Sequence, residues 1–201
     1  MRRERGFRVL SHEDVLTFWL DEVGPDGWYA GGDALDRLVR DRFAAAWQDA
    51  VEGGFGLWLT SPAGALAYVI LTDQLPRNMW RGSVQSFQLD PNARAAVRIV
   101  LSRDWDLQIS LPARQFFYLT LEHSENIVDQ DRAVALFATR MPDDANLHLH
   151  ARAHREVIRS FGRFPGRNAA LGRDSTPAEA LWLAQGAYGA VVRRLQAEPG
   201  N

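Results

Sequence analysis

Apolar residues recur every three or four positions along most of the chain, which is the spacing of amphipathic α-helices. The longest such pattern runs from Asp33 to about Glu52 and stops at Gly53-Gly54, a pair that favours the end of a helix. No segment alternates apolar and polar residues in the way that predicts a strand. The pattern therefore predicts an all-α fold of about eight helices joined by short turns.

Capping residues and prolines locate the ends of these helices. Ser11 is expected to open the first helix with Asp14 as its capping-box acid, and the glycines and proline of residues 21–32 predict a loop after it. Ser61-Pro62 has the same helix-starting character, with proline in the first helical position. The expected helices cover residues 11–20, 33–52, 61–71, 93–101, 113–121, 126–137, 143–161 and 175–195.

Two of the expected helices, at about residues 63–72 and 113–121, are apolar on almost every face. Helices without a polar face must be covered on both sides, so we expect layers of antiparallel helix hairpins rather than a simple four-helix ring. The length of 201 residues fits one domain, 1–201, with flexible ends at 1–10 and 196–201.

The composition excludes several kinds of chemistry. The chain has no cysteine, which removes disulfides, thiolate nucleophiles and cysteine zinc sites. All 23 basic residues are arginine, so no Schiff-base lysine or P-loop lysine is available. The net charge of -2 gives no reason to expect nucleic acid or an anionic membrane as a partner. No apolar run approaches a membrane span or a signal peptide, so we expect a cytoplasmic protein.

Two polar segments, residues 73–78 and 161–168, follow apolar helices and carry charge where we expect the backbone to turn. Asp73 follows a buried helix, where the helix dipole disfavours an acid unless a cation accompanies it. Five arginines are available as partners and are expected to outnumber the nearby acids, which would leave a guanidinium free to bind phosphate or carboxylate. The expected ligand-binding residues are Asp73, Gln74, Arg77, Asn78, Arg81, Arg163, Arg167, Asn168 and Arg173.

A second group of residues has the side chains of acid–base catalysis. Glu122, His123 and Glu125 follow the second apolar helix, and His154 lies in a later helix close to the second polar segment. His150 and His154 are four residues apart, so they share a helix face and are a candidate metal-binding pair. Structural hydrogen bonding is the competing interpretation of every one of these residues.

The order of the motifs resembles a known family. The motifs are Phe18-Trp19, Trp28-Tyr29, residues 73–78 with Arg81-Gly82, His123-Ser124-Glu125, Asp129-Gln130, His154-Arg155, residues 161–165 and residues 171–177. Over about residues 14–184 this succession resembles the bacterial family called domain of unknown function 924. The resemblance implies a tetratricopeptide-like right-handed superhelix and no established activity. Gly166 departs from the family, which commonly has histidine there.

Three functions follow as expectations. The first is a pocket that binds a small anionic molecule or an acidic peptide end. The second is a hydrolase or lyase that uses Glu122, His123, Glu125 and His154, with or without a metal. The third is a protein interaction module in which all the ion pairs are structural. The sequence identifies neither a cofactor nor an oligomeric state.

Overall fold

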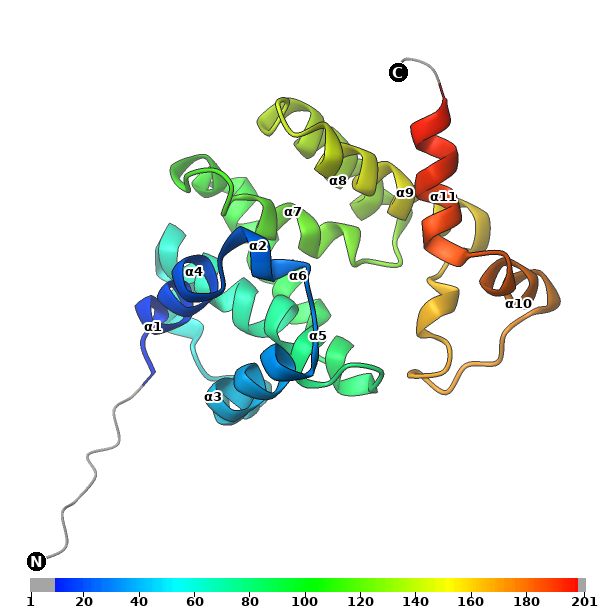
Figure 1. The fold of residues 1–201 in the computed structure, drawn as a ribbon. Helices are drawn as coiled ribbons and strands as arrows, with labels where there is room; N and C mark the ends of the chain where they lie inside the picture. Colours follow the sequence, from blue (N-terminus) through cyan, green and yellow to red (C-terminus); the bar gives the residue numbers. More distant parts are fainter. Residues whose placement is uncertain (1–9, 199–201) are drawn as a thin grey trace, which may run out of the picture.

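The computed structural model describes residues 10–198 of the chain, and every regular element in that range is a helix (Figure 1). The all-α prediction is therefore confirmed. Of the ends expected to be flexible, residues 1–9 and 199–201 lie outside the described residues. Leu10 packs against the main core, and the last helix continues to Ala197. The flexibility of both ends stays a prediction.

The first helical stretch is longer than predicted. α1 (His12–Leu16), which Ser11 and Asp14 cap as expected, continues through a π-helical segment, Thr17–Val23, into α2 (Gly24–Trp28). The predicted loop at 21–32 is therefore wrong over most of its length. Tertiary contacts outweigh the glycines here: the Trp28 indole donates a 2.6 Å hydrogen bond to the Trp19 carbonyl, and its ring lies 4.8 Å from that of Phe116.

The first apolar helix also continues beyond its predicted end. α4 (Pro62–Val69) passes through a π-helical segment, Ile70–Gln74, into α5 (Leu75–Met79), where a turn was expected at 73–78. Pro76 lies at the second position of α5, directly after the π-helical segment. The first polar segment is thus helical, and every residue from 64 to 76 is buried.

The remaining helices lie close to their predicted positions, with one exception. The stretch expected as a single helix over 175–195 is divided at Gly186, whose φ of 98° is available to glycine and strained for other residues. Short 3₁₀ turns join several of the helices. The helices are α3 (Asp33–Val51), α6 (Asp90–Ser102), α7 (Gln115–Glu122), α8 (Ile127–Arg140), α9 (Ala145–Phe161), α10 (Pro177–Ala184) and α11 (Ala187–Ala197).

The two apolar helices lie at the centre, as predicted. All residues of α7 are buried, and α4 packs against α1, α6 and α7. Helices that follow one another then pack in turn, α7 on α8 and α8 on α9, and α9 also contacts α11 at one side of the molecule (Figure 1). A second, smaller core holds α11 in place through Val157, Ile158, Phe164, Val191 and Leu195. Because α11 packs on α9, a C-terminal segment reaches the ends of the central helices.

Candidate functional site

A pocket of about 500 Å³ lies where the C-terminal ends of the central helices meet α2, α9 and α11. Aromatic rings form part of its wall, and nine polar or charged side chains converge on it. The lining residues are Trp19, Trp28, Tyr29, Gly31, Gln74, Arg77, Asn78, Arg81, Leu119, Glu122, His123, Asn146, Leu147, His150, His154 and Tyr188.

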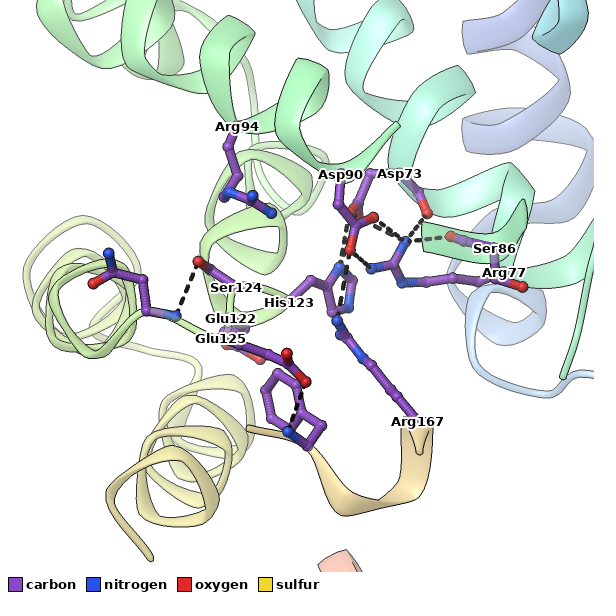
Figure 2. A network of polar contacts seen from close by, with 12 residues as sticks. Asp73, Arg77, Ser86, Asp90, Arg94, Glu122, His123, Ser124, Glu125 and Arg167 are labelled. Carbon is purple, nitrogen blue, oxygen red and sulfur yellow. Dashed lines mark hydrogen bonds and ion pairs between the residues drawn. The ribbon is translucent and has the colours of Figure 1, made fainter. Parts of the chain in front are cut away.

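His123 follows the last residue of α7 and is oriented by Asp73 of the other central helix. Its Nδ1 lies 2.9 Å and 3.0 Å from the two carboxylate oxygens of Asp73, which is fully buried (Figure 2). Gln74 donates a further short hydrogen bond to the same carboxylate. Burial and the positive charge of Arg77 lower the pKa of His123 to about 4, despite the opposing effect of Asp73.

His123 is accordingly neutral near pH 7, with the Nδ1 proton donated to Asp73 and the lone pair on Nε2. Burial by itself would raise the pKa of Asp73, but Arg77 and His123 outweigh it and keep the pKa below its ordinary value. An ionised aspartate that orients a neutral histidine is the arrangement that general-base catalysis uses.

Arg77 joins Asp73 to a second buried carboxylate. Its guanidinium lies 3.3 Å from Asp73 and donates hydrogen bonds of 3.1 Å and 3.2 Å to Asp90. Arg167, from the second polar segment, approaches Asp90 to 3.6 Å and lies over the rings of Phe87 and Phe164. Figure 2 shows the two arginines reaching Asp90 from different segments of the chain. The two polar segments are thus brought together, as predicted, through an aspartate that the sequence did not single out.

A second carboxylate–histidine pair lines the same pocket. His154 Nδ1 lies 3.2 Å from Glu122 Oε2, and its ring centroid is 6.4 Å from that of His123. Tyr188 of α11 lies 2.7 Å from His150 Nδ1 and 3.2 Å from His154 Nδ1. The structure therefore brings Glu122, His123 and His154 together, as the catalytic prediction requires.

The Nδ1 atoms of the candidate metal pair are engaged in hydrogen bonds. His150 Nδ1 is engaged by the Tyr188 hydroxyl, and His154 Nδ1 lies 2.9 Å from the His150 carbonyl. Among residues 10–198, no three or more His, Cys, Asp or Glu side chains are grouped so as to hold a metal ion. The arrangement of this pair fits a hydrogen-bonded network with Tyr188.

Arg81 and Asn78 both contact Asp36 of α3. The Arg81 guanidinium donates hydrogen bonds of 2.8 Å and 2.9 Å to this carboxylate, and the Asn78 amide donates one of 2.9 Å. These contacts attach the end of α5 to α3 along one edge of the pocket. Both residues line the pocket, but the charge of Arg81 is compensated.

Four of the predicted site residues belong to a separate cluster outside the pocket lining. Arg173 donates hydrogen bonds of 2.8 Å and 3.0 Å to Glu125, which also accepts the Phe164 backbone N–H. Arg163 pairs with Glu179, and the Asn168 amide donates to Ser175. These contacts hold the long segment between α9 and α10 against the end of α7. Glu125, Arg163, Asn168 and Arg173 do not line the pocket, and neither do Asp73 and Arg167, so the assignment of these residues to a catalytic or ligand-binding site stays a prediction.

The structure also adds residues that the sequence did not indicate. Tyr188 and Asn146 have no local signal, since each lies in an ordinary amphipathic helix. Trp19 lies almost entirely in the core, yet it also forms part of the pocket wall. Asp36 and Asp90 could have been suspected only as acids near helix starts.

Comparisons with known proteins agree with this description. The family model described as "Bacterial protein of unknown function (DUF924)" matches residues 15–187. A solved structure, that of the protein of unknown function ATU0120 from Agrobacterium tumefaciens, is 36% identical with a TM-score of 0.81 and aligns over 87% of this chain and 97% of its own. No curated protein matches the chain.

None of the helices in residues 10–198 has the length and apolar character that crossing a bilayer requires. The match to the family model covers most of the chain and includes the residues of both polar segments and every residue of the pocket lining except Tyr188. The chain belongs to the DUF924 family of bacterial proteins of unknown function.

Proposed function

We propose that this protein binds a small organic molecule in the pocket between α2, α7, α9 and α11. The observation that carries the proposal is the pocket itself: a hollow of about 500 Å³ lined by aromatic rings and by several convergent polar groups. Small-molecule sites in proteins have volumes of about 300–1,000 Å³ and this kind of lining. Buried polar side chains are costly to gather in one place, and a ligand that uses them would offset that cost.

The geometry gives less support to an anionic ligand than the sequence did. That expectation depended on a surplus of arginines, but each of the five contacts a carboxylate. Arg77 and Arg81 line the pocket and are paired with Asp90 and Asp36. The other three, Arg163, Arg167 and Arg173, contact Glu179, Asp90 and Glu125. The premise of an unpaired guanidinium in the pocket was therefore wrong, and an acidic peptide end loses the same support.

The proposal is tested by thermal denaturation in the presence of metabolites and fragments of different charge. We expect a subset to raise the melting temperature, because a ligand that binds only the folded state stabilises it. Asn146 is exposed and lines the pocket, so Asn146→Trp should fill the entrance without disturbing the core. The ligand-induced rise in melting temperature should be much smaller for Asn146→Trp than for the wild type. Shifts that persist unchanged in this variant, or no shift with any compound, would contradict the proposal.

Acid–base catalysis is a second candidate, and one observation favours it. The neutral His123, oriented by Asp73, faces the same pocket as the Glu122–His154 pair at a ring separation of 6.4 Å. A base and an acid at this separation on one bound molecule suit a hydrolase or lyase.

Mass spectrometry of a metabolite mixture incubated with the protein tests this candidate. A compound consumed by the wild type should be spared by His123→Ala and by Asp73→Asn, because the second variant leaves the imidazole without its orienting carboxylate. Consumption of the compound at equal rates by the wild type and both variants would show that His123 takes no part in the reaction.

The interaction-module function, the tetratricopeptide-like right-handed superhelix and the cytoplasmic location are kept as proposals. Support for the module comes from the ion pairs outside the pocket, such as Arg163 with Glu179 and Arg173 with Glu125, which join segments and leave the pocket walls untouched. Arg163→Ala should then lower the stability of the protein and leave ligand-induced shifts unchanged. A loss of those shifts at unchanged stability would instead assign Arg163 to ligand binding.

A further inference from the structure

Glu122 is a buried carboxylate that no hydrogen-bond donor satisfies. Its side chain is 1% exposed, it lines the pocket, and neither of its oxygens has a hydrogen-bond partner. Another fully buried carboxylate of the site, that of Asp73, accepts hydrogen bonds from Gln74 and His123. A carboxylate removed from water without donors costs several kcal/mol, so Glu122 differs from its neighbours in lacking compensation.

His154 is the nearest candidate partner, and its geometry does not supply a hydrogen bond. Nδ1 lies 3.2 Å from Glu122 Oε2 but 2.9 Å from the His150 carbonyl, which accepts its hydrogen. An imidazole nitrogen carries at most one hydrogen in either protonation state. Protonating Nε2 would therefore give Glu122 a neighbouring charge but no donor, and the need for a donor inside the pocket would remain.

Neither arginine that lines the pocket is free to donate to Glu122. The arginines that line the pocket, Arg77 and Arg81, each donate two hydrogen bonds to another carboxylate. Burial lowers the pKa of His150 as well as that of His123, so both rings are neutral near pH 7. The lining charges and their direct partners are two arginines, Arg77 and Arg81, and four carboxylates, Asp36, Asp73, Asp90 and Glu122. Arg167, which contacts Asp90, raises the arginines to three and leaves one negative charge in excess.

The walls around Glu122 are rich in aromatic rings. Trp28 and Tyr29 lie on one side of the pocket, and Tyr188 of α11 lies on another. Burial, with the nearby charge of Glu122, raises the pKa of both tyrosines, so their rings stay neutral and electron-rich. Aromatic rings beside a carboxylate form the surroundings that proteins use to bind an organic ammonium group.

We propose that the ligand of this pocket carries a protonated amine, which donates hydrogen bonds to the Glu122 carboxylate and lies among the rings of Trp28, Tyr29 and Tyr188. This inference rests on the proposed small-molecule pocket and adds the charge of the ligand. A cation of this kind supplies the donors that Glu122 lacks and neutralises the excess negative charge. It is also opposite in sign to the ligand expected from the arginine-rich sequence.

Three aromatic fragments of nearly equal size test the sign of the charge: benzylamine, benzyl alcohol and benzoate. Isothermal titration at pH 7 should give a dissociation constant for benzylamine about tenfold or more below that of benzyl alcohol, since hydrogen bonds to a charged group are worth about 1.5–3 kcal/mol. Benzoate should bind more weakly than either. The preference for benzylamine should disappear in Glu122→Gln, which keeps the shape of the side chain and removes its charge.

Thermal stability of the unliganded protein gives a second, independent readout. Glu122→Gln should raise the melting temperature by about 2–4 °C, because it removes an uncompensated buried charge. Glu125→Gln is the matched control three residues away. Glu125 accepts hydrogen bonds from Arg173 and from the Phe164 N–H, so this variant should lower the melting temperature and keep the preference for benzylamine.

The outcomes separate this inference from the proposal on which it rests. If benzyl alcohol or benzoate binds at least as tightly as benzylamine, and Asn146→Trp abolishes that binding, the pocket is a ligand site and the amine inference is overturned. The inference is equally overturned if Glu122→Gln keeps the preference for benzylamine or lowers the melting temperature as Glu125→Gln does. If none of the fragments or metabolites binds in the pocket, both proposals fail.

Discussion

Arg77→Met removes a guanidinium that lies between two buried carboxylates while keeping most of the length of the side chain. Arg77 contacts Asp73 at 3.3 Å and donates two hydrogen bonds to Asp90, and it also donates one of 2.5 Å to the Asp73 carbonyl. The Asp73 side chain is 0% exposed and that of Asp90 is 7% exposed. Neither carboxylate can turn to water when Arg77 is lost.

The expected loss of unfolding free energy follows from these exposures. Removing one partner of a buried ion pair costs about 3–5 kcal/mol, because the charge left behind stays desolvated. The Arg77 side chain is 20% exposed, so water screens part of the interaction and the lower end of that range, about 3 kcal/mol, applies. Such a loss is a large share of the stability of an ordinary domain.

The loss should depend on pH in a defined direction. Burial is the largest cause that lowers the pKa of His123, and the charge of Arg77 is the second largest. Removing Arg77 therefore raises the pKa of His123. A protonated His123 then becomes the counter-ion of Asp73 in the folded state. A raised folded-state pKa contributes stability that is present at low pH and is lost as the pH rises through it. The variant should therefore lose less stability at pH 5 than at pH 8.

Urea denaturation followed by tryptophan fluorescence measures both effects, and Arg81→Met is the matched control. Arg81 also donates two hydrogen bonds to an aspartate, Asp36, but its side chain is 58% exposed, so its loss should cost about 1 kcal/mol or less. Equal losses for the two variants at pH 8, or a loss for Arg77→Met that does not change between pH 5 and pH 8, would refute the reasoning.

Two further predictions concern buried groups. Burial and Arg77 lower the pKa of His123 to about 4, so the unfolded chain takes up this proton first, and wild-type stability should fall as the pH drops from about 6.5 to 4. His123→Gln should reduce the dependence of the unfolding free energy, measured by urea denaturation, on pH between about 6.5 and 4. An unchanged dependence on pH would contradict the assignment of a neutral histidine. A Cβ at Gly64 would collide with the Trp58 carbonyl oxygen, so Gly64→Ala should lower the melting temperature, whereas Gly166→Ala, which meets nothing within 4 Å, should leave it nearly unchanged.

Local sequence determined the helices and their burial. The spacing of apolar residues and the capping signals at Ser11 and Ser61 correspond to helix starts in the structure, because both act within one or two turns of chain. The two helices without a polar face had to lie at the centre, since no other position covers all their sides. An acid at the end of such a helix had to find a partner, and Asp73 did.

The tertiary structure alone decided which partner each charge took and which side chains share a pocket. Asp73 and His123 are 50 residues apart, Glu125 and Arg173 are 48 apart, and Tyr188 reaches the pocket only because α11 packs on α9. A count of arginines therefore suggested a free cation, where the fold instead pairs the arginines and leaves Glu122 without a donor. Pairing depends on distances between residues remote in the chain, and local patterns of polarity contain no information about those distances.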